Sequence, residues 1–282
     1  MSYKDIYTKV TKRFMDQGYI DILAYCQHPT GSECVPSWVP DWRSTICSPP
    51  IWKPVSNDPA FRTSGSSRLL QKVSHGVSDL LTLRGVRVDT VKEFGSVFGD
   101  TERRKRLQPK GTLQYLAEVR SFMAQSPRFN PGSEDIQTSR IAVADFSGYV
   151  KDLKTRAISS YAGFRHVLDG DTGHDGYLQN LDDSTKEVGS NRDYILNASK
   201  SFAALRLLRS VRPFISTSRY VGLAPVYVQA GDVICIILSG NVPYVLRKCG
   251  KAYILISKAY MHGIMYGEHM AGSPDVEDFT LK

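Results

Sequence analysis

The clearest hydrophobic pattern lies near the C-terminus, where short apolar runs alternate with turns. Apolar residues dominate positions 233–238, 242–247 and 252–257, and polar or glycine-containing turns separate these three runs. Runs of about six residues rich in Val, Ile and Tyr are too short for helices and are typical of strands joined by hairpins. The first run is apolar throughout, which indicates a strand buried on both faces. We therefore predict an antiparallel, small barrel-like β-module over residues 213–270.

The turns of this module have a local cause. Gly231 precedes the first run, and Gly240 and Gly250 stand between the runs; we expect all three to adopt positive φ angles without steric cost. Asp232 follows the first of these glycines and is expected to fix its turn through a side-chain hydrogen bond to the backbone.

The N-terminal pattern is different. Residues 6–25 place apolar side chains at helical spacing with lysines between them, which predicts an amphipathic helix that is interrupted at Gly18. Residues 26–59 then contain seven prolines and all three tryptophans, and this proline density excludes a regular helix or a central strand. We expect an extended strap that the tryptophans anchor to the core, with a ligand-stacking surface as the alternative.

The middle of the chain carries weaker signals. Strict alternation over 81–91 predicts a strand or strand pair bent at Gly85, and helical stripes cover 113–123 and 193–208. Residues 126–139 and 170–184 are expected to be loops, residues 141–167 to be helical in parts, and residues 271–282 to be a frayed tail. The predicted class is α+β, divided into residues 1–60, 61–212, 213–270 and 271–282.

Two blocks of residues, near opposite ends of the chain, carry a family resemblance. The motif positions that we single out are Trp38, Pro40, Asp41, Trp42, Gly222, Pro225, Gly231, Asp232, Gly240, Pro243, His262 and Gly263. In this order they resemble the C-terminal part of fungal heterokaryon incompatibility (HET domain) proteins. The resemblance assigns residues 1–60 to the end of a HET domain, most of which lies upstream in the family and has no counterpart here.

This resemblance implies a role in non-self recognition and programmed cell death after hyphal fusion. The chain would be a non-catalytic regulatory or scaffold portion that contacts other incompatibility proteins. In the family the HET domain is similar to TIR domains and is thereby linked to NAD cleavage. One alternative is therefore that the chain is a truncated gene product whose missing part is an NAD-cleaving effector. We carry over no catalytic residue.

Composition fits an ordinary globular protein. Of its 282 residues, 41% are hydrophobic and 23% are charged, and neither a membrane-length apolar run nor a signal-peptide pattern occurs, so we expect a cytoplasmic protein. Five irregularly spaced cysteines indicate reduced thiols rather than a disulfide framework. The net charge of +8 and the basic run Arg103–Arg106 leave nucleic-acid binding as a second alternative, although a solvated loop is the favoured interpretation of that run.

Candidate chemistry is sparse. Cys26, His28, Cys34 and Cys47 lack the paired spacing of structural zinc sites, and residues 169–176 fail the register of a calcium loop. Neither a Gly-x-Ser-x-Gly elbow nor a phosphate-binding loop occurs. We expect no catalytic residue, metal or cofactor, assign His262 a structural role in which it bonds a neighbouring carbonyl, and leave a homo-oligomer open.

Overall fold

A computed structural model describes residues 2–28, 35–44, 59–65, 73–75, 79–98, 109–129, 132–145, 204–205, 208 and 210–282. Several expected features lie outside these residues: Trp52, Cys34, Cys47, the basic run Arg103–Arg106, the loop over 170–184 and nearly all of the helix over 193–208.

The chain begins with two consecutive helices. Helix α1 spans Tyr3–Asp16, and Ser2 and Asp5 form a capping box that satisfies its first backbone N–H groups. Gly18 adopts a φ of +89°, which ends the α-helix, and the 3₁₀ helix η1 follows over Ile20–Tyr25. The predicted interruption at Gly18 is confirmed. Nowhere in the described part of the chain is a helix long and apolar enough to cross a membrane.

Within the described residues, the remaining elements are two helices, one further 3₁₀ turn and nine strands. The helices are α2 (Pro109–Ala124), α3 (Glu134–Ala142) and the 3₁₀ turn η3 (Met270–Gly272). The strands are β1 (Ser74–His75), β2 (Leu81–Phe94), β3 (Val211–Ser216), β4 (Val221–Pro225), β5 (Val233–Ile237), β6 (Tyr244–Cys249), β7 (Ala252–Lys258), β8 (Tyr260–Met261) and β9 (Glu277–Leu281). The α+β class and the C-terminal hairpins are confirmed.

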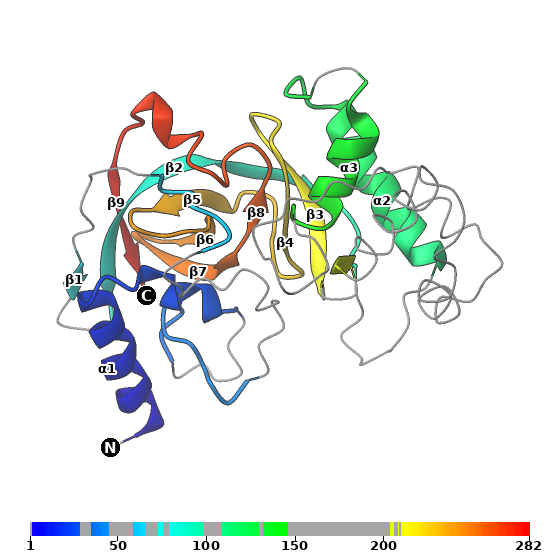
Figure 1. The fold of residues 1–282 in the computed structure, drawn as a ribbon. Helices are drawn as coiled ribbons and strands as arrows, with labels where there is room; N and C mark the ends of the chain where they lie inside the picture. The colour runs from blue at the N-terminus through cyan, green and yellow to red at the C-terminus, as the bar shows by residue number, and fades with distance from the viewer. Residues whose placement is uncertain are drawn as a thin grey trace, which may run out of the picture.

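Five of the strands close into a hydrogen-bonded ring. The order runs β5, β6, β7, β9 and β2, and β2 pairs with β5 again to complete the circle. All of these pairings are antiparallel except β7–β9, where the parallel contact joins one residue of each strand, Tyr253 and Leu281. Figure 1 shows β2 arching over the shorter strands of the ring.

The long strand β2 belongs to two sheets. Its first part pairs with β9 and β5, and from Val91 onward it pairs with β3, with a register shift between Val91 and Glu93. Strands β4 and β8 extend the sheet beyond β3, and helices α2 and α3 lie on the side of these strands (Figure 1). The bulges let one strand bend far enough to serve both layers.

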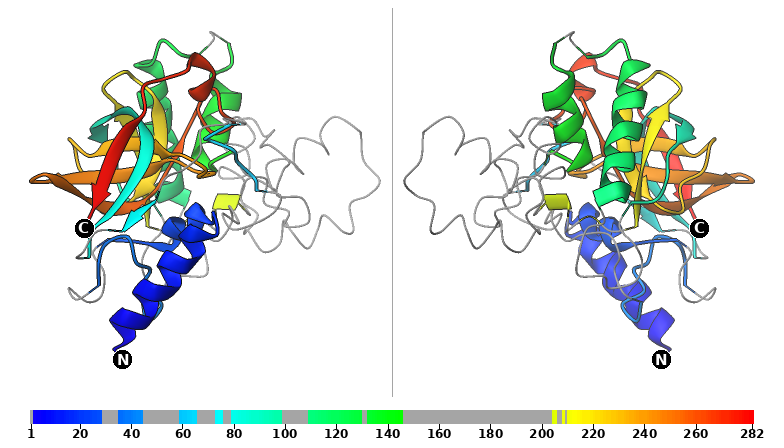
Figure 2. Two further views of the ribbon diagram at one scale, coloured as in Figure 1. Left: turned by 90° about the vertical axis from the view of Figure 1, so that its left-hand side faces the viewer. Right: turned by 90° about the vertical axis from the view of Figure 1, so that its right-hand side faces the viewer.

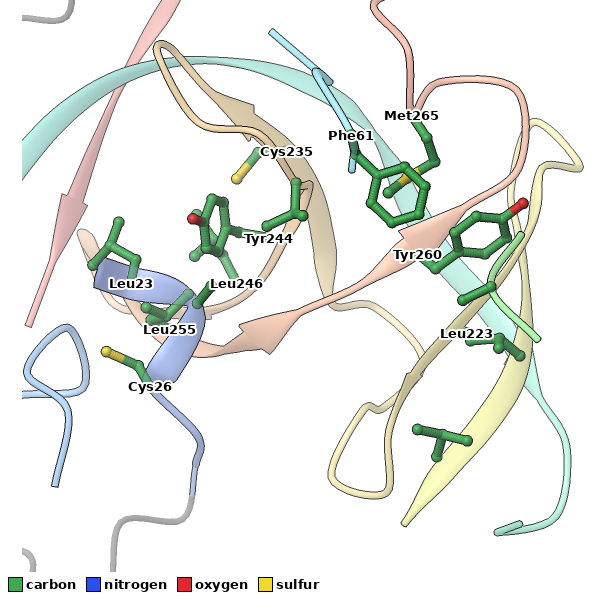
Figure 3. Close-up of a cluster of buried hydrophobic side chains, with 14 of the residues drawn as sticks. Leu23, Cys26, Phe61, Leu223, Cys235, Tyr244, Leu246, Leu255, Tyr260 and Met265 are labelled. Atoms are coloured by element: carbon green, nitrogen blue, oxygen red, sulfur yellow. The ribbon is translucent and has the colours of Figure 1, made fainter. Parts of the chain in front are cut away.

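The buried residues form two hydrophobic clusters, and β5 contributes to both. In β5, Cys235 and Ile237 enter one buried cluster, whereas Ile234 and Ile236 enter a second. All five residues of β5 are buried, which confirms the prediction of a strand covered on both faces. Figure 3 shows Leu23 and Cys26 of the N-terminal segment next to Tyr244, Leu246 and Leu255 of the ring.

Two predictions of irregular structure were wrong. Residues 271–282 are not a frayed tail, because β9 pairs with β2 along five consecutive residues and buries Phe279 and Leu281. Part of the predicted loop over 126–139 is helical, since α3 begins at Glu134. Short strands and helices with mixed composition give weak periodicity, so tertiary pairing decided both segments.

The turn glycines behave in two ways. Gly231 and Gly250 adopt positive φ as predicted, at +92° and +64°. In the turn before β6, by contrast, Ser239 adopts the positive φ of +64°, and Gly240 is required because a Cβ would lie 2.9 Å from the carbonyl oxygen of Ile237.

Gly222 on β4 offers a test of this packing. A Cβ at this position would lie 2.3 Å from the backbone oxygen of Tyr260 and 2.7 Å from the ring of Phe214. We predict that Gly222→Ala lowers the free energy of unfolding by about 3 kcal/mol, because backbone atoms cannot yield as side chains can. Urea denaturation measures this value. Gly272→Ala is the control, since its Cβ would have nothing within 4 Å; equal stability of the two variants would contradict the prediction.

Candidate functional site

A buried polar cluster fastens the N-terminal segment to the ring. Asp21 of η1 accepts hydrogen bonds from the backbone N of Asn241 (2.9 Å to Oδ1), from the Asn241 side-chain amide (2.6 Å to Oδ2) and from the Tyr244 hydroxyl (2.9 Å to Oδ1). Lys258 on β7 donates from Nζ to the carbonyl of Ala24 at 3.1 Å. Both charged residues are almost fully buried, at 4% and 1% exposure.

Burial shifts the pKa of each charged group in the direction that favours its neutral form. It raises the pKa of Asp21 to about 6, although the bonds from Asn241 and Tyr244 and the positive charge of Lys258 oppose the change. It lowers the pKa of Lys258 to about 8, opposed by Asp21 and Cys26. Burial also raises the pKa of the Cys26 thiol well above its usual value. Because the cluster is sealed from solvent and its carboxylate is already bonded, its evident role is to hold two parts of the chain together.

The strap completes the ring where strand pairing stops. Beyond Tyr253, no described strand continues along the outer edge of β7. Instead, the N–H of His28 donates to the carbonyl of Ile256 at 2.9 Å, and the N–H of Leu255 donates to Oγ of Ser37 at 3.0 Å. The backbone N–H and the hydroxyl of Ser37 both donate to the carbonyl of Lys282, just after β9. Ser37 therefore joins β7 to the C-terminal residue Lys282, and we call this junction the seam.

The motif residues of the strap divide into buried and exposed sets. Trp38 is fully buried and donates from Nε1 to the carbonyl of Asp79 at 2.8 Å, as expected of an anchor. Pro40 and Asp41 are buried, and Asp41 forms a paired ion contact with Arg43. Trp42 is 43% exposed and packs on Tyr25 from one side.

The motif residues of the C-terminal module have structural partners. Asp232 accepts from the N–H of Gln229 at 2.8 Å and binds both Nε and Nη2 of Arg247, so it fixes the turn and also ties β6 to it. The Nδ1 atom of His262 lies 3.0 Å from the hydroxyl of Tyr260, and its ring stacks on Phe129.

The remaining motif positions are backbone features. Gly263 adopts a φ of +87° after β8, and Gly222 permits the close approach between β4 and β8. Pro225 ends β4, and Pro243 is buried immediately before β6. The structure thus distributes the twelve motif positions over the strap and the turns of the module rather than gathering them at one catalytic centre.

A surface groove of about 450 Å³ lies where the end of β2 meets α2 and β3. Its lining residues are Glu93, Phe94, Gly95, Ser96, Glu118, Ser121, Phe122 and Arg212. The carboxylate of Glu118 accepts from both the N–H and the hydroxyl of Ser96 at 2.7 Å, and Arg212 donates to the carbonyls of Gly95 and Val226. These polar groups brace the groove walls. Within the described ranges, no three His, Cys, Asp or Glu side chains are grouped so as to hold a metal ion.

Helix α1 leaves part of its apolar surface exposed to solvent. Thr11 and Met15 are its buried residues. The exposed apolar side chains on and just after the helix are Tyr3 (37%), Ile6 (45%), Val10 (41%), Phe14 (37%) and Tyr19 (46%). Ile6, Val10 and Phe14 are spaced by four residues and form one row along the helix. We call these five residues the α1 stripe.

Comparisons with known proteins agree with the ring of strands. Residues 150–281 match the Het-6 beta-barrel domain family. The chain is also 25% identical over 285 aligned positions to heterokaryon incompatibility protein 6, OR allele, of Neurospora crassa, in an alignment that covers 90% of this chain and 40% of the relative. The chain is thus similar to a fungal heterokaryon incompatibility protein. It therefore spans about 40% of the length of the curated relative that it matches, and no solved structure matches it.

The segment that matches the Het-6 beta-barrel domain family is shorter than the folded unit of strands. Strand β2 lies before residue 150, yet it pairs with β3, β5 and β9 inside the matched segment. The strap and the Asp21 cluster also lie before that residue. The ring therefore depends on residues outside the matched segment.

Sequence reasoning missed the Asp21 cluster as a unit. Asp21 and Tyr244 stand inside the two resemblance blocks, but their separation of more than 220 positions hid their contact. A usable signal was present in each half, because Asp21 interrupts the apolar run Ile20–Ala24 and Lys258 follows the apolar run of β7. A charged residue within an apolar run indicates a buried group that needs a partner.

The first prediction for this site concerns pH. Because the pKa of Asp21 is about 6 in the folded state against 3.8 when unperturbed, the protonated form stabilises the fold at low pH and this stabilisation is lost as pH rises through 6. Asp21→Asn removes the titration. The free energy of unfolding of the variant relative to wild type should therefore rise by roughly 2–2.5 kcal/mol between pH 4 and pH 7.

Denaturant titrations at several pH values measure this difference. Asp278→Asn, at an exposed position on β9, is the control and should show a smaller change. A difference between Asp21→Asn and wild type that is flat across this pH range would contradict the assignment.

The second prediction concerns the seam. Ser37→Ala removes the acceptor of the Leu255 N–H and one donor to Lys282, so we expect a loss of about 1–3 kcal/mol in stability. Hydrogen exchange followed by mass spectrometry should show faster exchange in β7 and β9 than in β5. Ser121→Ala, on the exposed surface of α2, is the control. Unchanged protection of β7 in Ser37→Ala would show that strand pairing alone closes the ring.

Proposed function

We propose that this chain is a non-catalytic regulatory or scaffold portion of a fungal heterokaryon incompatibility protein. In this proposal it acts in the cytoplasm, in non-self recognition and the programmed cell death that follows, through contacts with other incompatibility proteins. The relationship to incompatibility protein 6 of Neurospora crassa over 90% of the chain supports the biological setting.

The observation that carries the proposal is the orientation of α1. A helix that folds only for its own domain turns its apolar face to the core. Here the α1 stripe faces outward, while the following helix η1 is locked to the ring through Asp21. An exposed apolar row on a helix favours contact with a further protein segment, which supports a role in protein contacts.

The motif residues support the same interpretation. Asp232, His262 and Asp41, the polar members of the set, are each engaged in contacts that hold turns or strands. Side chains used in this way contribute to rigidity, and a rigid scaffold loses less conformational entropy when it binds.

Gene deletion tests the proposal in the fungus that encodes this chain. We expect deletion to suppress cell death in at least one incompatible hyphal pairing, measured as the fraction of viable fusion cells, and reintroduction of the gene to restore it. Purified protein incubated with NAD should leave its concentration unchanged. Normal cell death in every pairing, or consumption of NAD by the chain alone, would contradict the proposal.

A further inference from the structure

The groove between the end of β2, helix α2 and β3 is lined by charges of both signs. Figures 1 and 2 show α2 in green beside β3 in yellow. Arg212 of β3 contributes a guanidinium, and Glu93 of β2 and Glu118 of α2 contribute carboxylates, while Phe94 and Phe122 supply apolar surface. A volume of about 450 Å³ is in the range of small-molecule sites, which combine apolar walls with a few fixed polar groups.

The guanidinium of Arg212 is fixed by three contacts. Its Nε donates to the carbonyl of Gly95 at 3.0 Å, and Nη1 donates to the carbonyl of Val226 at 3.3 Å. The Cζ atom lies 3.9 Å from the centre of the Phe94 ring, so the aromatic face also holds the cation. Within the described residues Nη2 donates to no acceptor. Arg212 therefore brings a positioned guanidinium with unused donors to the groove.

The carboxylate of Glu118 is also held in place. Its Oε2 accepts the backbone N–H of Ser96 at 2.7 Å, and its Oε1 accepts the Ser96 hydroxyl at 2.7 Å and Nε2 of Gln114 at 3.2 Å. Gly95 permits this approach, because a Cβ there would lie 2.4 Å from Oε2 of Glu118. All of these donors are uncharged, so they orient the carboxylate without neutralising it.

The opposite charges of this groove are close together but are not paired. Burial lowers the pKa of Arg212, and the nearby negative charge of Glu118 opposes this change. Each of the two groups is bonded to other partners, and the described part of the chain forms no ion pair between them. Glu93 is exposed and adds a second carboxylate. The groove thus offers a ligand both a positive and a negative group.

We propose that this groove binds a small zwitterion, either an α-amino acid or a short peptide with free ends. The ligand's carboxylate pairs with the guanidinium of Arg212, and its ammonium group pairs with Glu118 and Glu93. Its apolar side chain lies against Phe94 and Phe122. This inference goes beyond the proposed function and does not depend on it.

Ligands of a single charge fit the groove less well. A simple anion meets the carboxylates of Glu93 and Glu118, and a simple cation meets the guanidinium of Arg212, so that like charges oppose binding in both cases. An uncharged apolar ligand would displace water from these charged groups without replacing its hydrogen bonds, which costs free energy. A zwitterion supplies a partner for each sign of charge.

Isothermal titration calorimetry of the whole chain with L-leucine and with glycyl-L-leucine tests the proposal. We expect saturable binding of one or both. Derivatives of each ligand that lack one charge, with either an acetylated amino group or an amidated carboxyl group, should bind about tenfold more weakly, because each loses a charge-assisted hydrogen bond. The protein is the same in all of these titrations, so a folding defect cannot produce the result. The tighter of the two ligands distinguishes an amino acid from a peptide.

Variants of the groove test the two charged ends separately. Arg212→Gln should weaken binding of L-leucine about tenfold but should leave binding of L-leucinamide nearly unchanged, because the amide lacks the carboxylate. Glu93→Gln should weaken binding of L-leucine and leave that of N-acetyl-L-leucine unchanged. Asp278→Asn, which removes an exposed carboxylate on β9 outside the groove, is the control and should bind as wild type does.

The remaining outcomes would overturn the site. These are no heat of binding with either ligand, or equal affinities for a zwitterion and both of its singly charged derivatives. Tighter binding of N-acetyl-L-leucine than of L-leucine would show that the groove takes an anion, and tighter binding of L-leucinamide would show that it takes a cation. In each case the proposed function would still stand if gene deletion suppresses cell death.

Discussion

The contact between Asp21 and the turn before β6 is the interaction on which the rest of the structure depends. It joins residues 21 and 241 through one carboxylate that accepts two bonds from Asn241 and one from Tyr244. Burying this carboxylate costs free energy, and only the complete set of donors and the nearby Lys258 offset the cost. Once the contact forms, η1, the strap and the direction of α1 are fixed together.

The strap and β2 convert a set of hairpins into a closed ring. Hairpins β5–β6 and β6–β7 follow from the local sequence, but by themselves they leave the outer edges of β5 and β7 open. Strand β2 covers the edge of β5, and His28 and Ser37 cover part of the edge of β7. Covered edges protect a sheet from pairing with other chains. The N-terminal third of the chain is therefore a structural part of the C-terminal module.

The same constraint explains the outward α1 stripe. Because η1 is anchored and Gly18 sets the angle between the two helices, α1 cannot rotate freely to bury its apolar row. It contacts the rest of the protein through Thr11 and Met15, while Ile6, Val10 and Phe14 remain exposed. A row of apolar side chains that is exposed to water costs free energy, but such rows are also a feature of surfaces that bind other protein segments. In this way the Asp21 cluster in the core determines the orientation of the α1 stripe.

The sequence alone determined what depends on near neighbours: the apolar runs of β5 and β7, the positive φ of Gly231 and Gly250, the interruption at Gly18 and the α+β class. The resemblance blocks located the anchors Trp38 and Asp41. Only the tertiary structure decided the hydrogen bonds between Asp21 and Asn241 and the contact of Ser37 with both β7 and Lys282. It also decided the pairing of β9 with β2, because the sequence of β9 has no clear strand pattern. Periodicity reports which face of an element is buried, whereas partners distant in the chain are chosen by the packing of the whole.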